Sequence, residues 1–344
     1  MMDVISPYVS FCFTTYKRKD YLKSTLESVR AQTFSNFEAI ISDNDPEQSG
    51  RSVVEGMNDS RFKYFANDEN LGMKKSFNKS LERSSGEYIV MIADDDPVYP
   101  DMLETLMRLK DQHPEFGMFL GACNWFCTHP EIAKLYKLKV GINSMLADKE
   151  IDTVETYSAS DFLINFFNFN IFPTYLWSTG MIKREILIEK GGVPDYNTAF
   201  LGDYAYLSVL ASHSGCVIIN RALGHQTIHT QNFGRAQNEQ IKTAAVNFID
   251  YVSAKINGVK NWPMIEKHMR RFVALWVVSH LNFLNRYYKL YPPEEPVNLN
   301  AIEKDIFKQD FMQPFHLKFL LKKHTPLLHD FMVLQKKKFK KVLN

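Results

Sequence analysis

The chain has 344 residues, a hydrophobic content of 45%, an aromatic content of 13% and a formal net charge of +2. This composition is typical of a packed globular protein and excludes an intrinsically disordered chain. The length exceeds what one typical core needs, so we expect either a large domain with an appendage or two domains.

The start of the chain, MMDVISPYVSF, lacks the charged and then apolar layout of a signal peptide. No segment has the run of about 20 apolar residues that spans a bilayer. The four cysteines are too few for a disulfide framework in a chain of this length. We therefore expect a cytoplasmic protein.

The first hundred residues alternate between two patterns. Short apolar runs rich in β-branched and aromatic residues predict strands at 8–15, 37–42, 61–67 and 88–93. Apolar residues at helical spacing predict helices at 20–32, 51–58, 72–85 and 101–112. This alternation predicts a Rossmann-like α/β fold, with a mostly parallel twisted sheet and helices on both faces.

The next stretch is less regular. We expect strands at 117–126 and 216–220, a strand end and short helix over 178–192, and a loop leading into a helix over 199–215. Residues 162–177, FLINFFNFNIFPTYLW, fit either buried core with a surface loop or an aromatic platform for a sugar or lipid acceptor. We favour core.

From about residue 236 the apolar residues recur at helical spacing. We therefore divide the chain into an α/β domain over residues 1–235 and a helical C-terminal region over residues 236–344.

Polar clusters follow three of the predicted strands. They are TTYKR after the first strand, DND after the second, and Asp94, Asp95 and Asp96 after the fourth. Adjacent carboxylates raise each other's pKa, and a divalent cation held by oxygen atoms would compensate them. The alternative is an acidic turn that solvates the strand end. Because parallel strands end at one edge of the sheet, three converging clusters favour a metal-assisted site.

The order of these motifs resembles glycosyltransferase family 2. The similar motifs are TTYKR, SDND, ENLG and SSGEYIVMIADDD with PDML shortly after, and the resemblance covers roughly residues 7–235. It implies the GT-A fold and an inverting enzyme of the hexosyltransferase type. Such an enzyme moves a sugar from a nucleotide-diphosphate donor to a hydroxyl of a glycan or lipid-linked glycan. By analogy, the pathway is bacterial surface-polysaccharide synthesis, of lipopolysaccharide or capsule.

The resemblance assigns donor-binding roles to five residues, of which the last, Asp95, is also a metal ligand. Thr15 ends the first strand, and Tyr16 lies in the turn after it and matches a residue that packs on the base. Asp43 matches the acid that accepts a hydrogen bond from the base, and Asp94 matches the ribose contact. A carboxylate at Asp43 favours UDP or dTDP, since uracil and thymine present an N3–H. The alternatives are an Asx-type turn for Asp43 and a core-lid tyrosine for Tyr16.

The resemblance also implies a Mn²⁺ or Mg²⁺ cofactor. Asp95 matches the principal metal ligand, and Asp96 is a neighbouring acid that would act through water. His229 matches a histidine that ligates the metal or contacts the diphosphate, with a surface or core histidine as the alternative. Ala93 stands where the family often has its first acid.

Inverting transfer needs a carboxylate base, because the acceptor hydroxyl loses its proton as it attacks. The stretch GGVPDYNTAFLGDYAYL matches the family's glycine turn and acidic pair before a helix, with Gly202 in place of the glutamate. We expect Asp203 to be this base; its alternative is a helix N-cap. Because Ala93 and Gly202 depart from the family pattern, a catalytically inactive relative that binds nucleotide or glycan remains the second hypothesis.

The tail carries most of the positive charge. Residues 311–344 hold eight lysines and a single acid, Asp330, so the rest of the chain is mildly acidic. Lysines that flank leucines and phenylalanines at helical spacing favour contact with an anionic membrane surface, at the inner face of the cell membrane. A terminal helix packed on the body is the alternative. We do not expect nucleic-acid binding, since the rest of the chain is not basic.

Overall fold

The computed structural model describes residues 6–146, 149–171, 177–198, 200–229, 240–293 and 296–325. The first elements are β1 (Val9–Thr15), α1 (Lys19–Arg30), β2 (Phe37–Asp43), α2 (Arg51–Glu55), β3 (Phe62–Ala66), α3 (Met73–Arg83), β4 (Tyr88–Ala93) and α4 (Met102–Gln112). The next are β5 (Met118–Cys127), α5 (Pro130–Tyr136), β6 (Gly141–Asn143), β7 (Val154–Tyr157), α6 (Ala159–Phe167), β8 (Gly180–Lys183), α7 (Arg184–Glu189), α8 (Gly202–Ser214) and β9 (Cys216–Ile228). The last are the helices α9 (Ile241–Ile256), α10 (Trp262–Leu290), α11 (Leu299–Ile306) and α12 (His316–His324).

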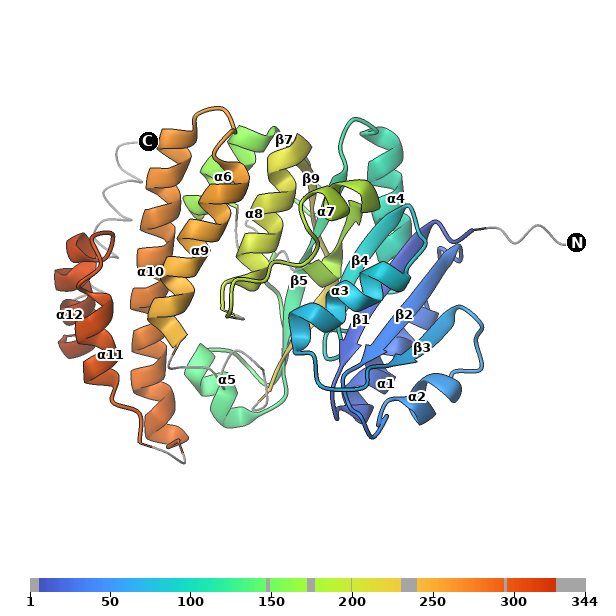
Figure 1. Cartoon of the computed structure of the whole chain (residues 1–344), viewed down its shortest axis with the longest axis horizontal. Helices are drawn as coiled ribbons and strands as arrows, with labels where there is room; N and C mark the ends of the chain where they lie inside the picture. Colours follow the sequence, from blue (N-terminus) through green and yellow to red (C-terminus); the bar gives the residue numbers. More distant parts are fainter. Residues whose placement is uncertain are drawn as a thin grey trace, which may run out of the picture.

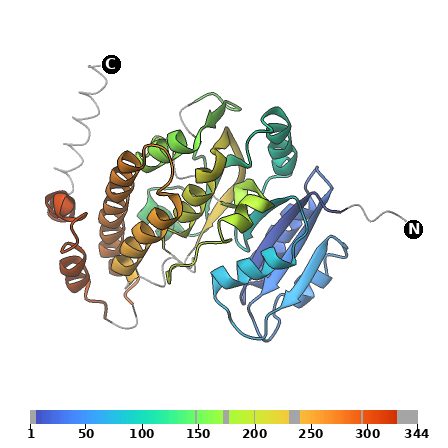
Figure 2. The ribbon, with the colours of Figure 1, turned by 45° about the horizontal axis from the view of Figure 1, so that its top comes forward.

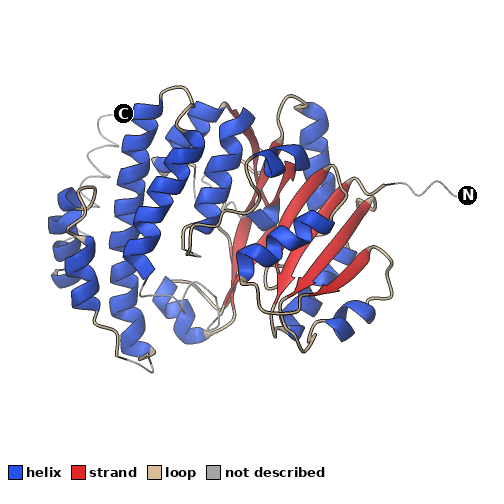
Figure 3. Cartoon of the chain, viewed as in Figure 1, coloured by secondary structure: helices blue, strands red, loops and turns tan. Residues whose placement is uncertain are grey.

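All described strands belong to one mixed sheet (Figure 3). Its order is β3-β2-β1-β4-β8-β5-β9-β7, and β6 pairs with β5. The strands β1 to β4 are parallel to one another, and β8 lies antiparallel between β4 and β5. The central position of β1, between β2 and β4, brings the loops after these three strands to one edge of the sheet.

The two faces of the sheet bury separate sets of side chains. Alternate residues of β1 show this, because Phe11 and Phe13 face one cluster and Cys12 faces the other. The first cluster is covered by α1, α2 and α4, where Leu22, Leu26 and other apolar residues recur at helical spacing. The second cluster is covered by α3 and by the helices from α6 onward. The predicted fold, a mostly parallel sheet with helices on both faces, is confirmed.

The helical region continues the second face. Figures 1 and 2 show α9 between α8 and α10, with α11 and α12 on the outer side of α10. Buried residues of α9, α10 and α12 belong to the same apolar cluster as Cys12 of β1 and Phe77 of α3. The division at residue 235 stays a prediction.

Two expectations for the middle of the chain can be compared with the structure. Within 162–177, the residues Phe162, Phe166 and Phe167 of α6 are buried, so the core interpretation is confirmed there, while 172–176 lie outside the described residues. The strand predicted at 216–220 was too short, since β9 runs to Ile228. The reason is a register shift against β5, after which pairing resumes through Cys127.

In the described part of the chain, no helix combines the length and the apolar character needed to cross a membrane.

Candidate functional site

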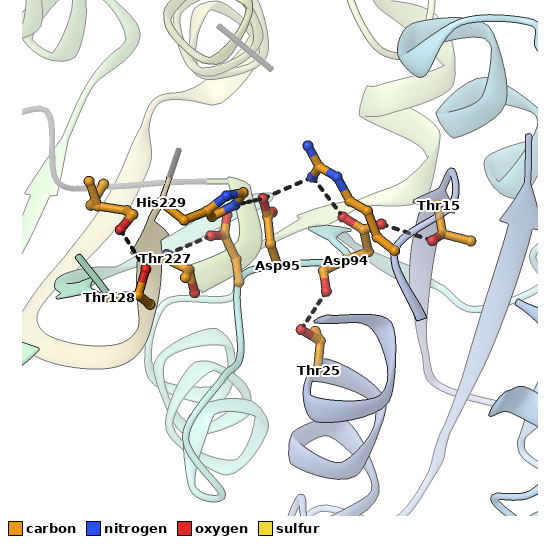
Figure 4. A network of polar contacts seen from close by, with 10 residues as sticks. Thr15, Thr25, Asp94, Asp95, Thr128, Thr227 and His229 are labelled. Atoms are coloured by element: carbon orange, nitrogen blue, oxygen red, sulfur yellow. Dashed lines mark hydrogen bonds and ion pairs between the residues drawn. The ribbon is translucent and has the colours of Figure 1, made fainter. Parts of the chain in front are cut away.

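The three aspartates follow β4 at the edge where β1 and β2 also end. Asp94, Asp95 and Asp96 are all buried, with 5%, 8% and 7% of their surface exposed. Asp94 is held from the neighbouring strand, because the hydroxyl of Thr15 donates to its Oδ2 at 2.8 Å. The hydroxyl of Thr25, on α1, donates to the backbone carbonyl of Asp94 at 2.9 Å (Figure 4). The acidic turn is therefore anchored by β1 and α1.

Arg18 supplies the nearest positive charge. Its Nη1 lies 3.3 Å from Oδ1 of Asp94 and 3.0 Å from Oδ2 of Asp95. The side chain remains 22% exposed at the site. Arg18, in the loop after β1, thus neutralises part of the negative charge of the three aspartates.

His229 contacts the middle aspartate from the end of β9. Its Nε2 lies 3.0 Å from the same Oδ2 of Asp95 (Figure 4). The imidazole stacks on the ring of Tyr21, with centroids 4.6 Å apart and an interplanar angle of 24°. The extension of β9 beyond its predicted end is what carries His229 to the aspartates.

The loop after β4 is also tied to β9. The backbone N–H of Thr227 donates to Oδ1 of Asp96 at 3.1 Å, and His225 donates its backbone N–H to the Pro97 carbonyl at 3.0 Å. Gly224 allows this approach, since a Cβ there would lie 2.8 Å from the carbonyl oxygen of Pro97. These contacts bring Asp96 and His229 to one place.

The environment of the site favours the protonated, neutral forms of Asp94 and Asp96. Burial, followed by the charge of Asp95, raises the pKa of Asp94 to about 7 although Arg18 opposes the shift. Burial and the charge of Asp95 also raise the pKa of Asp96 well above its usual range, with a smaller contribution from Asp203. A positive charge placed beside these carboxyl groups would stabilise their ionised forms.

Asp203 lies in the first turn of α8, after Leu201, which has a left-handed backbone with φ of 61°. Burial raises the pKa of Asp203 to about 6. Its charge acts on Asp96, as well as on Tyr196 and Tyr204. It is not the residue that caps α8, because Leu201 occupies the N-cap position. The tertiary structure therefore brings Asp203 into the electrostatic field of the acidic turn.

Asp43 and Tyr16 differ in how far they face solvent. Asp43 is fully buried, and its carboxylate accepts hydrogen bonds from the N–H groups of Asp45 and Gly50 and from the Tyr64 hydroxyl. The bond from Asp45 is the Asx-type turn that we named as its alternative. Tyr16 is 43% exposed beside the site. The base-binding roles of both residues stay predictions.

Sequence reasoning missed Arg18, Thr25 and Tyr21. A signal for Arg18 was present, because TTYKR places a cation after β1 and three aspartates follow β4. The adjacency of β1 and β4, which a doubly wound strand order favours, would have paired these charges. Thr25 and Tyr21 lie on α1 without any motif, so only the packing of α1 against the loop identifies them.

The side chains present suit a hard divalent cation by their chemistry. Carboxylate oxygens are the ligands that Mg²⁺ and Mn²⁺ prefer, and His229 adds a nitrogen beside Asp95. In the described ranges, no three His, Cys, Asp or Glu side chains are arranged to hold an ion by themselves. A cation bound here would thus take few protein ligands, which is usual where phosphate oxygens complete the coordination.

Comparison with known proteins gives a consistent result. The profile described as "Glycosyl transferase family 2" matches residues 10–189. A Campylobacter jejuni protein named GalNAc(5)-diNAcBac-PP-undecaprenol beta-1,3-glucosyltransferase is 26% identical over 206 residues, which are 59% of this chain and 59% of that protein. An uncharacterized glycosyltransferase of Haemophilus influenzae is 27% identical over 251 residues, 71% of this chain and 75% of that protein. The chain thus spans only part of each of these relatives.

Solved structures match over nearly the whole chain. S. aureus TarS in complex with UDP-GlcNAc has a TM-score of 0.57 at 15% identity and covers 91% of this chain and 79% of its own. The mannosyltransferase PcManGT from Pyrobaculum calidifontis, in complex with GDP-Man and Mn²⁺, has a TM-score of 0.52 at 14% identity and covers 94% and 88%. At these identities the likeness concerns the fold, and it agrees with the predicted GT-A architecture.

Proposed function

The chain belongs to glycosyl transferase family 2, and from this premise we propose that it transfers a sugar from a nucleoside-diphosphate donor to a hydroxyl of a glycan or lipid-linked glycan acceptor. One observation carries the proposal. The carboxyl edge of the sheet brings together three buried aspartates, Thr15, Arg18 and His229. The negative charge of Asp203 also acts on Asp96 at this edge. Ligands bind at this edge in open α/β sheets.

The proposed reaction is one displacement at the anomeric carbon. The acceptor oxygen forms a bond to that carbon while the bond to the diphosphate oxygen breaks, and the nucleoside diphosphate leaves. Asp203 accepts the hydroxyl proton of the acceptor. A carboxyl with a pKa of about 6 is well matched to this role, since it is ionised near neutral pH and still basic enough to take a proton.

The donor is held, in this proposal, by Thr15, Tyr16, Asp43, Asp94 and Asp95. Tyr16 is exposed and would pack on the base. Asp43 would accept a hydrogen bond from a uracil or thymine N3–H, which requires one of its present donors, such as the Tyr64 hydroxyl, to move away. Thr15 and Asp94 are already joined by a hydrogen bond and would face the ribose as a unit. This favours a UDP or dTDP donor, and the UDP-GlcNAc complex of TarS is in line with it.

A divalent cation would be held directly by Asp95 and His229, with Asp96 acting through a bound water. Such a cation, Mn²⁺ or Mg²⁺, neutralises charge that develops on the departing diphosphate. The raised pKa of Asp96 reflects buried negative charge that an added cation would relieve. The Mn²⁺ complex of PcManGT, a protein of the same fold, is in line with this assignment.

We infer the location of the acceptor from the surface of the C-terminal helix α12. On α12, Leu317 and Leu320 are 69% and 37% exposed, while Phe319 packs inward at 1%. Lysines and histidines surround the two leucines, so this helix offers an amphipathic surface to anionic lipid. The last part of the predicted tail, residues 326–344, lies outside the described residues. We place the enzyme at the inner face of the cell membrane, where it would meet a lipid-linked acceptor.

A donor screen tests the proposal. Melting temperatures are measured with UDP-, dTDP-, GDP- and CDP-sugars, with and without Mn²⁺, for the native chain and for Asp95→Ala. We expect a Mn²⁺-dependent increase with a UDP- or dTDP-sugar that Asp95→Ala abolishes, and sugar transfer that Asp203→Asn abolishes. Nucleotide binding without any transfer or donor hydrolysis would instead support the inactive relative that Ala93 and Gly202 suggest.

A further inference from the structure

Arg18 occupies an unusual position among the acids of the site. A single nitrogen of its guanidinium, Nη1, contacts both Asp94 and Asp95, at 3.3 and 3.0 Å. Both carboxylates are buried, whereas the arginine side chain reaches them from the partly exposed loop between β1 and α1. The positive charge therefore stands between solvent and the acidic pair.

The Asp95 oxygen that Arg18 contacts, Oδ2, also contacts His229. Oδ2 of Asp95 lies 3.0 Å from Arg18 Nη1 and also 3.0 Å from His229 Nε2. A carboxylate oxygen offers about two lone pairs, so both are engaged by these two nitrogens. A cation at this oxygen must therefore displace at least one of the two partners.

Charge decides which partner leaves. A divalent cation within a few ångströms of a guanidinium is strongly repelled, because arginine stays protonated at all accessible pH values. An imidazole nitrogen is itself a common metal ligand, so His229 can stay beside a cation at Asp95. Arginine also forms strong, often bidentate, hydrogen bonds to phosphate oxygens. A displaced guanidinium beside a bound donor would thus find a new partner in the diphosphate.

We infer that Arg18 is an exchangeable counter-charge, which neutralises Asp94 and Asp95 before the donor binds and moves to the diphosphate when a cation takes its place. This inference rests on the proposed cation site and extends it. It gives Arg18 two opposite effects, since the residue competes with the cation for the acids and assists the nucleotide. A salt bridge with only a structural role has neither effect.

The test measures binding by the full chain. Mn²⁺ affinity is determined from the electron paramagnetic resonance signal of free Mn²⁺, and UDP affinity by calorimetry at saturating Mn²⁺. The variants are Arg18→Ala, Arg18→Gln, Arg18→Lys and Asp95→Ala. Lys17→Ala is the matched control, because Lys17 lies in the same loop but pairs with Asp45. Circular dichroism and thermal melts check that each variant is folded.

We expect Arg18→Ala and Arg18→Gln to bind Mn²⁺ at least about tenfold more tightly than the native chain, a change of about 1.4 kcal/mol. Arg18→Lys keeps the charge and should stay near the native affinity, as should Lys17→Ala. At saturating Mn²⁺ the two neutral variants should bind UDP at least about tenfold more weakly.

Equal or weaker Mn²⁺ binding by both neutral variants would overturn the inference, whatever the native affinity. This result is distinct from failure of the proposed function, which would appear as no nucleotide-dependent increase in the melting temperature of the native chain and no transfer that depends on Asp203.

Discussion

Replacing Asp203 with asparagine should remove sugar transfer and at the same time stabilise the fold at alkaline pH. Asparagine has nearly the same shape but cannot accept the acceptor's proton, so we expect turnover to fall by a factor of about 10² to 10⁴. The second effect follows from the pKa of Asp203, which burial raises from 3.8 to about 6. A carboxyl that ionises with difficulty in the folded state opposes folding once it is charged.

The direction and size of the stability effect follow from linkage. Because the folded pKa lies above the unfolded one, the proton on Asp203 stabilises the fold fully below pH 3.8, and this contribution is lost as the pH rises through about 6. The shift of about two units corresponds to about 3 kcal/mol as an upper bound. Since Asp203 is partly exposed, solvent screening reduces this figure, and we expect Asp203→Asn to be more stable than the native chain by about 1–2 kcal/mol at pH 8.

The assay compares urea unfolding of both proteins at pH 8 and at pH 4. We expect Asp203→Asn to be the more stable at pH 8 and the two to converge at pH 4. Asp161→Asn, which removes an exposed acid from the first turn of α6, is the control and should not stabilise the chain at pH 8. Lower stability of Asp203→Asn at pH 8, or transfer within tenfold of the native rate, would refute the reasoning. The native transfer rate should itself fall as the pH drops through about 6.

Three further changes test other parts of the structure. Leu317→Ser combined with Leu320→Ser should reduce sedimentation with anionic vesicles at low salt without changing the melting temperature; unchanged sedimentation would count against membrane contact through α12. Gly224→Ala should force the loop after β4 away from β9, lowering both stability, by about 1–3 kcal/mol in urea, and nucleotide binding. Phe272→Ala should cost about 3–5 kcal/mol in the same assay, because its ring packs between α6 and α8, whereas Phe272→Leu should cost clearly less.

The first half of the fold could be predicted because its signals are local. Each strand from β1 to β4 is a short apolar run, and α1, α3 and α4 repeat their apolar residues at helical spacing. Strand extension was harder to predict, as β9 shows. Its last residues, LGHQTI, are neither continuously apolar nor strictly alternating, and they form a strand because β5 and the bridge from Val98 to Gly224 pair with them.

The features of the candidate site likewise fall into those that the sequence predicts and those that only the tertiary structure shows. The sequence by itself determined that acids follow β2 and β4, that an aspartate opens a helix after a glycine turn, and that the order of these motifs is that of glycosyl transferase family 2. Such features depend on neighbours within a few residues, so they can be predicted from the amino-acid sequence.

Only the tertiary structure decided which groups meet. It joined Arg18 and His229, 211 positions apart in the chain numbering, on one oxygen of Asp95. It also gave Asp203 a raised pKa, since burial belongs to the packed molecule and not to the motif. The physical reason is that electrostatic interactions act through space and grow as water is excluded, and neither distance nor exclusion of water is written in the local sequence.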